Sequence, residues 1–299
     1  AGMISEQLKI NLVIPFDKKA KENIIGFQFG GGWEYKHWEN EKWACVIDSV
    51  IKYNSKNKYA IHLIGHPSEE GMINNIIDLM HENRYDIIFT KTLGFRHDSI
   101  ESGIAAIRTL GEQHGFKVFH SEDASVINIR KLENYHVVIF LNTSGDILDN
   151  EQQEHFKRYI QTGGGWVGIH SATDTEYEWP WYGQLAGAFF NGHPRIQNAD
   201  LIVTNKSHPT TKNLPDLWSR KDEWYNFRYL NPKINILINL DESSYEGGTN
   251  GENHPISWYH SYEGGRAFYT ALGHTKESYS EKLFLGHLLA GISWCMSDD

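Results

Sequence analysis

Cysteine is scarce in this sequence, with only Cys45 and Cys295 among 299 residues. Two thiols do not make a disulfide framework, and neither lies at a spacing that is typical of metal ligands. A reducing compartment is the simpler expectation, and we therefore predict a cytoplasmic protein. The first ten residues, AGMISEQLKI, contain neither a basic nor an apolar region, so we expect no signal peptide in them.

Basic residues are also few, because 28 Lys and Arg stand against 38 Asp and Glu and give a formal net charge of -10. A duplex nucleic-acid binder needs a basic face that displaces phosphate counterions, and an anionic membrane surface attracts the same kind of face. No apolar run approaches the roughly 18 residues of a transmembrane helix. We therefore expect neither nucleic acid nor a membrane as a partner.

Several familiar catalytic motifs are missing. The sequence has no G-x-x-x-x-G-K-[ST] phosphate loop, no G-x-G-x-x-G after a strand and no serine in G-x-S-x-G. Neither cysteine lies at the end of a predicted strand, which makes a thiol nucleophile improbable. A P-loop, a dinucleotide-binding turn and an α/β-hydrolase nucleophile are thus excluded.

Apolar strands alternate with helices along the chain, which predicts an α/β fold with a mostly parallel sheet covered on both faces. We expect a helix between the caps Asp149 and Gly163, and a last helix that begins with a capping box of Ser278 and Glu281. Residues 172–265 are rich in Trp, Tyr, His, Asn, Gly and Pro, which is typical of loops and short strands over a site. Further strands are predicted at 8–16, 59–65, 85–91, 116–121, 136–142, 165–171 and 266–273, and further helices near 43–51, 72–80 and 100–114.

The ends of four predicted strands carry ionisable side chains, and ligands of parallel sheets bind at the carboxyl ends of strands. Aspartate and serine at these ends are accounted for as caps of the helices that follow, but capping does not call for histidine. The pattern therefore favours a functional cluster. The residues concerned are His97 and Asp98, Asp146, His170 and Asp174, and His274.

Histidine and the aromatic residues are abundant, with 16 His, 10 Trp and 15 Tyr. Aromatic and imidazole side chains on loops suit a flat, polar and neutral ligand such as a sugar, although the same residues also pack beneath long loops. The segments that carry them are Tyr177–Tyr182 and Asp222–Arg228.

Several stretches together resemble the ThuA-like (trehalose utilisation) family over about residues 85–299. The resemblance implies a flavodoxin-like three-layer sandwich of the class I glutamine amidotransferase-like superfamily. Residues 1–84 lie outside it and are predicted to form an accessory N-terminal α/β segment. The stretches are FTKTLGFRHDSIESG, the long run from FLNTSGDILDN to FFNGHP, DEWYNFR, HPISWYH and FYTALGHTKESYSEKLFLGHLLAGI.

The sequence departs from the amidotransferase pattern at the nucleophile. In amidotransferases the tight turn after a central strand carries a cysteine, whereas the equivalent stretch here, VGIHSAT, places His170 there. The stretch GHTKE offers His274 and Glu277 where the amidotransferase histidine motif lies. Glutamine hydrolysis through a thioester is therefore excluded, while the position of the pocket is retained.

The resemblance implies a role in carbohydrate metabolism, on a sugar or on a disaccharide oxidised at C3 to a 3-keto form. A ketone at C3 acidifies the C2 proton, so that a base can form an enolate that expels the C1 substituent. The candidate bases are His170 and His97, the candidate oxyanion stabilisers are Arg96 and Lys91, and the candidate acids are Glu223, His274 and Asp174. The other predicted substrate-binding residues are Asn142, Tyr177, Trp181, Trp224, Arg228 and His254.

Two alternatives remain open at this point. One is a sugar-binding or regulatory protein without catalysis, and the other is a metal-dependent hydrolase or isomerase. No short-spaced motif such as H-E-x-x-H requires a cofactor, but Zn, Mn or Fe is a candidate metal. Its predicted ligands are His97, His170, His254 and His274 with Asp174 or Glu223. The expected partner is a small carbohydrate, and a homo-oligomer is an open expectation.

Overall fold

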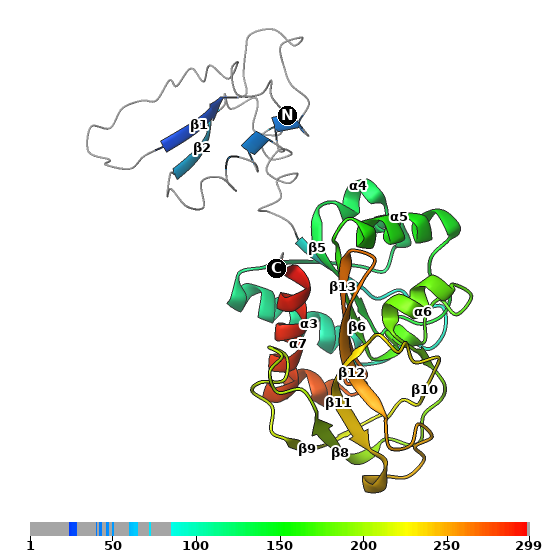
Figure 1. Cartoon of the computed structure of the whole chain (residues 1–299). Coiled ribbons are helices and arrows are strands. Elements are labelled where there is room, and N and C mark those ends of the chain that lie inside the picture. The colour runs from blue at the N-terminus through cyan, green and yellow to red at the C-terminus, as the bar shows by residue number, and fades with distance from the viewer. Residues whose placement is uncertain are drawn as a thin grey trace. The chain divides into compact units, whose positions relative to one another are not determined.

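The computed structural model divides the chain into two compact units, residues 1–84 and residues 85–299 (Figure 1). The structure describes residues 85–297, two strands of the first unit and scattered helical positions within 40–50 and at 72. The two strands, β1 (Ile24–Gln28) and β2 (Ala60–Ile64), pair in parallel. The strand predicted at 59–65 is thus confirmed, the one at 8–16 lies outside the described residues, and β1 was not predicted.

The second unit contains a nine-stranded sheet. Five of its strands run parallel. When these five are numbered 1 to 5 in chain order, their order across the sheet is 2-1-3-4-5, which is the flavodoxin-like order. The predicted flavodoxin-like parallel sheet is therefore confirmed. In spatial order these strands are β4 (Lys117–Ser121), β3 (Tyr85–Phe89), β5 (Tyr135–Leu141), β6 (Gly165–Ile169) and β13 (Gly265–Thr270).

Four antiparallel strands of six to eight residues extend the sheet beyond β13, within the segment 172–265 that was predicted to hold loops and short strands, but the individual strands were not predicted. The reason is visible in the last of them, which buries Trp218, Arg220 and Asp222 alternately. Because charged residues occupy the inner face, the sequence lacks the alternation of apolar and polar residues that indicates a strand. The extension consists of β12 (Pro255–Tyr262), β11 (Asn235–Asp241), β8 (Gln197–Val203) and β9 (Leu217–Asp222), beside a small pair of β7 (Phe189–Phe190) and β10 (Phe227–Arg228).

Helices cover both faces of the parallel strands, as Figure 1 shows. Helices α3 (Ile100–His114) and α7 (Lys282–Met296) pack on one face and on each other. The other face carries α4 (Ile129–Leu132), α5 (Asn150–Gln161) and α6 (Pro180–Ala186). Within the described residues, no helix is long and apolar enough to cross a bilayer.

The two predicted helix starts have different outcomes. At α5 the Asp149 carboxylate accepts from the Gln152 amide and the Gln152 side chain accepts from the Asp149 amide, which confirms the capping box. The capping box predicted at Ser278 is wrong, because α7 begins only at Lys282 and Ser278 lies inside the 3₁₀ helix Lys276–Ser280. The Ser278 hydroxyl instead bonds to the buried Asp222.

Helix α7 packs closely against the sheet at Gly291. A Cβ atom on this residue would lie 2.3 Å from the ring of Phe268, which is fully buried in β13. Glycine is therefore required here by the packing of α7 against the sheet. At Gly286, on the exposed side of the same helix, a Cβ atom would meet nothing within 4 Å.

Candidate active site

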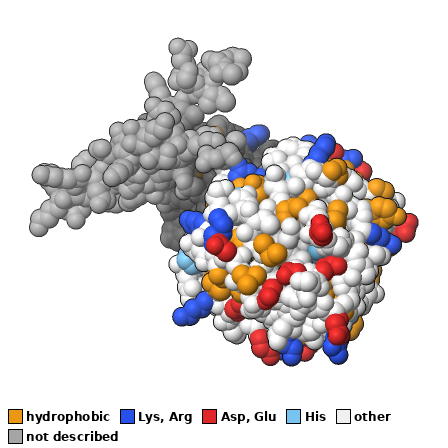
Figure 2. Space-filling model, turned by 60° about the horizontal axis from the view of Figure 1, so that its bottom comes forward, with side chains coloured by type: hydrophobic (Ala, Val, Ile, Leu, Met, Phe, Trp, Pro, Cys, Tyr) orange, Lys and Arg blue, Asp and Glu red, His pale blue; other side chains and the backbone are white. Residues whose placement is uncertain are grey.

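The parallel strands end at one edge of the sheet, and three of the loops that follow them bring imidazoles together. His97 follows β3, His170 follows β6 and His274 follows β13, and Glu223 joins them from the end of β9. One ligand-type atom from each of these four residues lies within 4.8 Å of the others. We call these four residues the His–Glu cluster. Figure 2 views the molecule from this end of the sheet, where histidine and acidic side chains lie among hydrophobic ones.

His170 occupies the tight turn after β6 in a left-handed backbone conformation, with φ of 51°. Its side chain is fully buried, and its Nδ1 lies 2.8 Å from the carbonyl oxygen of Ala271. A carbonyl oxygen only accepts, so Nδ1 carries the proton and donates it. In the neutral ring the lone pair is therefore on Nε2, the atom that faces the cluster.

Glu223 connects the imidazoles. Its Oε2 lies 3.3 Å from Nε2 of His170 and 3.1 Å from Nδ1 of His274, and these two nitrogens are 3.1 Å apart. The other oxygen, Oε1, lies 3.1 Å from Nδ1 of His193. One nearly buried carboxylate thus contacts three imidazoles, of which His193 is the most exposed.

The environment shifts the protonation of these groups in different directions. Burial opposes ionisation of Glu223, but the hydrogen bonds from His170 and His274 outweigh it and hold the pKa of this carboxyl well below its usual range. Burial alone would lower the pKa of His274, yet contact with Glu223 raises it. Burial and the neighbouring imidazoles lower the pKa of His97 to about 3, so its ring is neutral.

Aromatic rings and a carboxyl group surround the cluster. The Tyr225 ring packs on His170 with centroids 4.2 Å apart, and Phe190 packs on Tyr225 at the same distance. Tyr177 donates to Asp174 at 2.6 Å, and burial raises the pKa of the Asp174 carboxyl in spite of this bond. Asp174 ends the 3₁₀ helix His170–Thr173, whose first residue is His170, so it lies near the cluster.

Arg228 and Phe95 contact residues of the cluster or its neighbours. The Arg228 guanidinium lies over the Tyr177 ring, 5.0 Å from its centroid, at an exposed position. The exposed Phe95, which was not predicted, packs edge-on against His97 with centroids 4.9 Å apart. An exposed ring thus contacts one imidazole of the cluster, and an exposed guanidinium covers the Tyr177 ring.

Three residues predicted from the strand ends are directed elsewhere. Arg96 forms ion pairs with Glu122 at 2.6 Å and Glu101 at 3.1 Å. Lys91 is half-buried and interacts electrostatically with Asp123. Asn142 is fully buried and donates to Ser99, so its amide is part of the fold.

Three predicted ligand-binding residues, Trp224, Trp181 and His254, have structural roles. Trp224 is fully buried, and its indole N–H donates to the carbonyl oxygen of Gln197. Trp181 donates to Glu263, in the turn that precedes β13, at the opposite edge of the sheet.

His254, the third of these residues, is also absent from the cluster. Its Nδ1 lies 2.8 Å from Glu242 and its Nε2 lies 2.8 Å from the carbonyl oxygen of Tyr225. Both ring nitrogens are used, so His254 is not available as the metal ligand that was predicted. Asp174 is likewise outside the set of four.

His193 and Tyr225 touch the cluster but were not predicted as individual site residues. Neither follows a parallel strand, because both belong to the segment around the two-residue strands β7 and β10. Tyr225 lies in the aromatic segment Asp222–Arg228 that the sequence singled out, whereas the only sequence signal for His193 was its position in the stretch FFNGHP.

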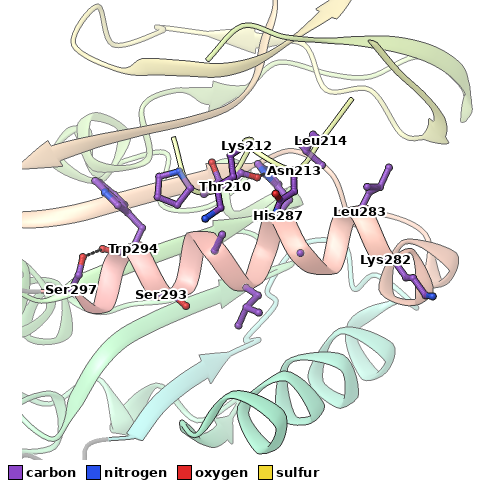
Figure 3. A pocket seen from close by; sticks show the side chains of 14 residues that line it. Thr210, Lys212, Asn213, Leu214, Lys282, Leu283, His287, Ser293, Trp294 and Ser297 are labelled. Atoms are coloured by element: carbon purple, nitrogen blue, oxygen red, sulfur yellow. Dashed lines mark hydrogen bonds between the residues drawn. The ribbon is translucent and has the colours of Figure 1, made fainter. Parts of the chain in front are cut away.

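A separate hollow of about 570 Å³ lies between α7 and residues 209–214 (Figure 3). His287 lines it, but its Nδ1 donates to the carbonyl oxygen of Thr210 and its Nε2 lies 3.0 Å from the Ser257 hydroxyl. This imidazole is therefore fixed within the fold. The His–Glu cluster is the better candidate for chemistry.

Comparisons with known proteins agree with the architecture. A family model described as ThuA, trehalose utilisation, matches residues 87–295. The chain is similar to the structure of a ThuA-like protein from Bacteroides uniformis, with 28% identity, a TM-score of 0.63 and coverage of 72% of this chain and 93% of that one. A ThuA-like protein from Parabacteroides merdae is similar at 23% identity, a TM-score of 0.61 and coverage of 71% and 90%.

More distant similarity concerns the fold alone. A cytoplasmic protein from Salmonella typhimurium shares it at 9% identity, with a TM-score of 0.52 and coverage of 71% of this chain and 98% of that one. No curated protein matches the sequence.

Proposed function

Since this chain belongs to the ThuA (trehalose utilisation) family, we propose that it is a carbohydrate-processing enzyme whose reaction takes place at the His–Glu cluster. The observation that carries the proposal is the convergence of His97, His170, His274 and Glu223 at the carboxyl edge of the sheet. Purely structural residues have no need for three imidazoles on one buried carboxylate.

The substrate that suits this site is a sugar with a carbonyl group, such as a 3-keto-disaccharide. A base removes the C2 proton, the electron pair forms an enolate with the C3 oxygen, and the C1–O bond breaks. The leaving oxygen then takes a proton, and water adds to the unsaturated sugar. The site must therefore stabilise an enolate oxygen and transfer protons at two positions.

Two groups beside the cluster are suited to the proton transfers. Asp174 has a raised pKa because it is partly buried, and a carboxyl of this kind gives or takes a proton closer to neutral pH than an exposed one. His193 is bound to Glu223 through Nδ1 and is partly exposed, with 42% of its side chain accessible. The cluster itself would face the enolate oxygen.

The aromatic side chains support a carbohydrate as ligand. Tyr225 and Phe190 form a continuous apolar wall beside His170, and Tyr177 adds a ring held by Asp174. Binding sites for small molecules combine such apolar walls with a few fixed polar groups. The C–H faces of a sugar ring would pack on the wall while its hydroxyl groups reach the carboxylates.

The test is a turnover assay followed by mass spectrometry. The substrates are trehalose, sucrose, maltose, cellobiose and their 3-keto forms, in buffer with and without added divalent metal. We expect wild type and Trp181→Phe to consume a 3-keto sugar, and Asp174→Asn to be at least about 100-fold slower.

The outcomes of this assay differ in what they mean. Consumption of a keto sugar with the expected loss of one sugar unit supports the proposal, and the product mass identifies the reaction. Binding of a sugar by folded, metal-replete protein without any turnover would replace the enzyme with a sugar-binding protein. Equal rates for Asp174→Asn and wild type would remove Asp174 from the mechanism.

A further inference from the structure

Three donor atoms of the His–Glu cluster form a nearly equilateral triangle. The sides join Nε2 of His170, Nδ1 of His274 and Oε2 of Glu223, and they measure 3.1, 3.1 and 3.3 Å. Ligands about 2.0–2.1 Å from a tetrahedral ion lie about 3.3–3.4 Å apart, and ligands on one face of an octahedron lie about 3.0 Å apart. The triangle therefore has the size of one face of a transition-metal coordination sphere.

The orientation of His170 suits a ligand. Because its Nδ1–H donates to the carbonyl oxygen of Ala271, the lone pair of the neutral ring on Nε2 points to Glu223 and His274. A metal-binding histidine commonly has its second nitrogen fixed in this way by a carbonyl or a carboxylate.

The surroundings supply what a bound ion needs. His170 and Glu223 are almost completely buried, and the three donors come from the ends of three different strands, which limits their movement. Oε1 of Glu223 is held by His193 at 3.1 Å, which leaves Oε2 for the triangle. His97 packs edge-on against both His170 and His274, and its ligand-type atom lies within 4.8 Å of the three donors.

We propose that His170, His274 and Glu223 bind one divalent first-row transition-metal ion through Nε2, Nδ1 and Oε2. Two imidazoles and a carboxylate suit Zn, Mn, Fe or Co, whereas Mg and Ca prefer sites made of oxygen alone. The site differs from the predicted one, since His254 and Asp174 take no part in it. The open side of the triangle would face the substrate, where a cation stabilises an oxyanion.

The proposal does not depend on the proposed reaction, because metal binding is measured without any substrate. The full chain is freed of metal with a chelator, and Zn²⁺ is then titrated in competition with a chelator of known affinity. Co²⁺ is used in parallel, because its visible absorption reports coordination by protein ligands. Bound metal is also counted by mass spectrometry after dialysis.

The variants separate ligands from neighbours. Glu223→Gln preserves the shape of the side chain, His170→Ala and His274→Ala remove one imidazole each, and His155→Ala is the control on α5. We expect wild type and the control to bind one ion with a Kd below about 1 µM. Each of the three ligand variants should weaken Zn²⁺ binding at least about 100-fold and lose the Co²⁺ absorption.

Circular dichroism of the metal-free proteins identifies any variant that fails to fold. If the alanine variants do not fold, the comparison of Glu223→Gln with wild type tests the proposal. Retention of less than about 0.1 equivalent of Zn²⁺ and Co²⁺ by folded wild type would overturn the proposal. Unchanged affinity in all folded ligand variants would overturn it as well. If the metal binds as expected and no sugar is turned over, the metal site stands and the proposed reaction fails.

Discussion

The carboxylate of Asp222 accepts, through Oδ2, a hydrogen bond of 3.0 Å from the backbone amide of Gly273. Its other oxygen accepts the amide of Glu223, also at 3.0 Å. One fully buried side chain at the end of β9 therefore holds the two backbone positions from which Glu223 and His274 enter the cluster. Gly273 has φ of 108°, a conformation that favours glycine, so the turn before His274 is specified by its residue type as well.

Removal of the Asp222 carboxylate should destabilise the protein strongly. Arg220 lies 3.2 Å from Asp222 Oδ2 and is itself nearly buried, so Asp222→Ala leaves a buried charge without this partner. We expect a loss of about 3–5 kcal/mol in the free energy of unfolding, measured in urea. The exposed cap Asp123→Ala is the control and should cost much less. Equal losses for the two variants would contradict this role.

Asp222→Asn tests positioning separately from stability, because it keeps one acceptor oxygen. If Asp222 places Glu223 and His274, the folded Asn variant should bind Zn²⁺ about 10–100-fold more weakly than wild type. A purely structural residue would change the free energy of unfolding without changing the metal affinity of the folded protein. Unchanged affinity in Asp222→Asn would thus limit this residue to stability.

Two glycines of α7 offer a matched pair for the packing of this helix. Gly291→Ala places a methyl group 2.3 Å from the Phe268 ring, and such overpacking typically costs about 1–3 kcal/mol. Gly286→Ala meets nothing within 4 Å, so it should stabilise the helix by up to about 1 kcal/mol. Thermal unfolding of the two variants should shift in opposite directions. A stabilised Gly291→Ala would show that α7 lies farther from β13.

Stability should depend on pH through Asp86. Burial raises the pKa of this carboxyl to about 8, against 3.8 for an ordinary aspartate. Between these two values the folded state holds a proton that the unfolded chain releases, so stability is lost as the pH rises from about 4 to about 8. The loss is about 1.4 kcal/mol per pH unit within this window.

Asp86→Asn removes the ionisable group and should therefore remove this part of the pH dependence. The measurement is urea unfolding of wild type and variant at pH 5 and pH 7.5. We expect Asp86→Asn to gain stability relative to wild type at the higher pH. Parallel curves over the whole range would mean that the Asp86 carboxyl is solvated in the folded protein.

The parallel half of the fold could be predicted from the sequence because its signals are local. The helical spacing of Ile104, Ile107 and Leu110 indicates α3, and the capping box marks the start of α5. In the antiparallel half β9 could not be predicted, because it carries inward charged residues, Arg220 and Asp222. Their ion pair makes burial possible, and Ser278 and Glu281, which complete the contacts of Arg220, lie far along the chain, where no local pattern indicates them.

Part of the candidate site could also be predicted from the sequence, and part could not. His97, His170 and His274 could be predicted because parallel strands place their carboxyl ends side by side. The same argument gave wrong positions for long side chains: Arg96 follows the same strand as His97 but turns to Glu122 and Glu101. A strand end fixes where the backbone lies, but the nearest opposite charge decides where a flexible cation points.

Tyr177 should control the protonation of Asp174, which the proposed reaction uses for proton transfer. Its hydroxyl donates to Asp174 Oδ1 at 2.6 Å and so stabilises the carboxylate form. Removal of this donor in Tyr177→Phe should raise the pKa of Asp174 further, because burial already raises it and Tyr177 opposes that effect. The limb of the pH–rate profile that requires the Asp174 carboxylate should therefore move to higher pH.

The matched control is Tyr229→Phe, because Tyr229 is 76% exposed and shares with Tyr177 only its contact with Arg228. Both variants keep the aromatic ring, so loss of apolar contact cannot explain a difference between them. The measurement is kcat/KM on the accepted keto sugar across pH 4–9, since this ratio reports the pKa values of the free enzyme. A profile that moves equally in both variants, or in neither, would assign the proton transfer to another group beside the cluster, with His193 as the next candidate.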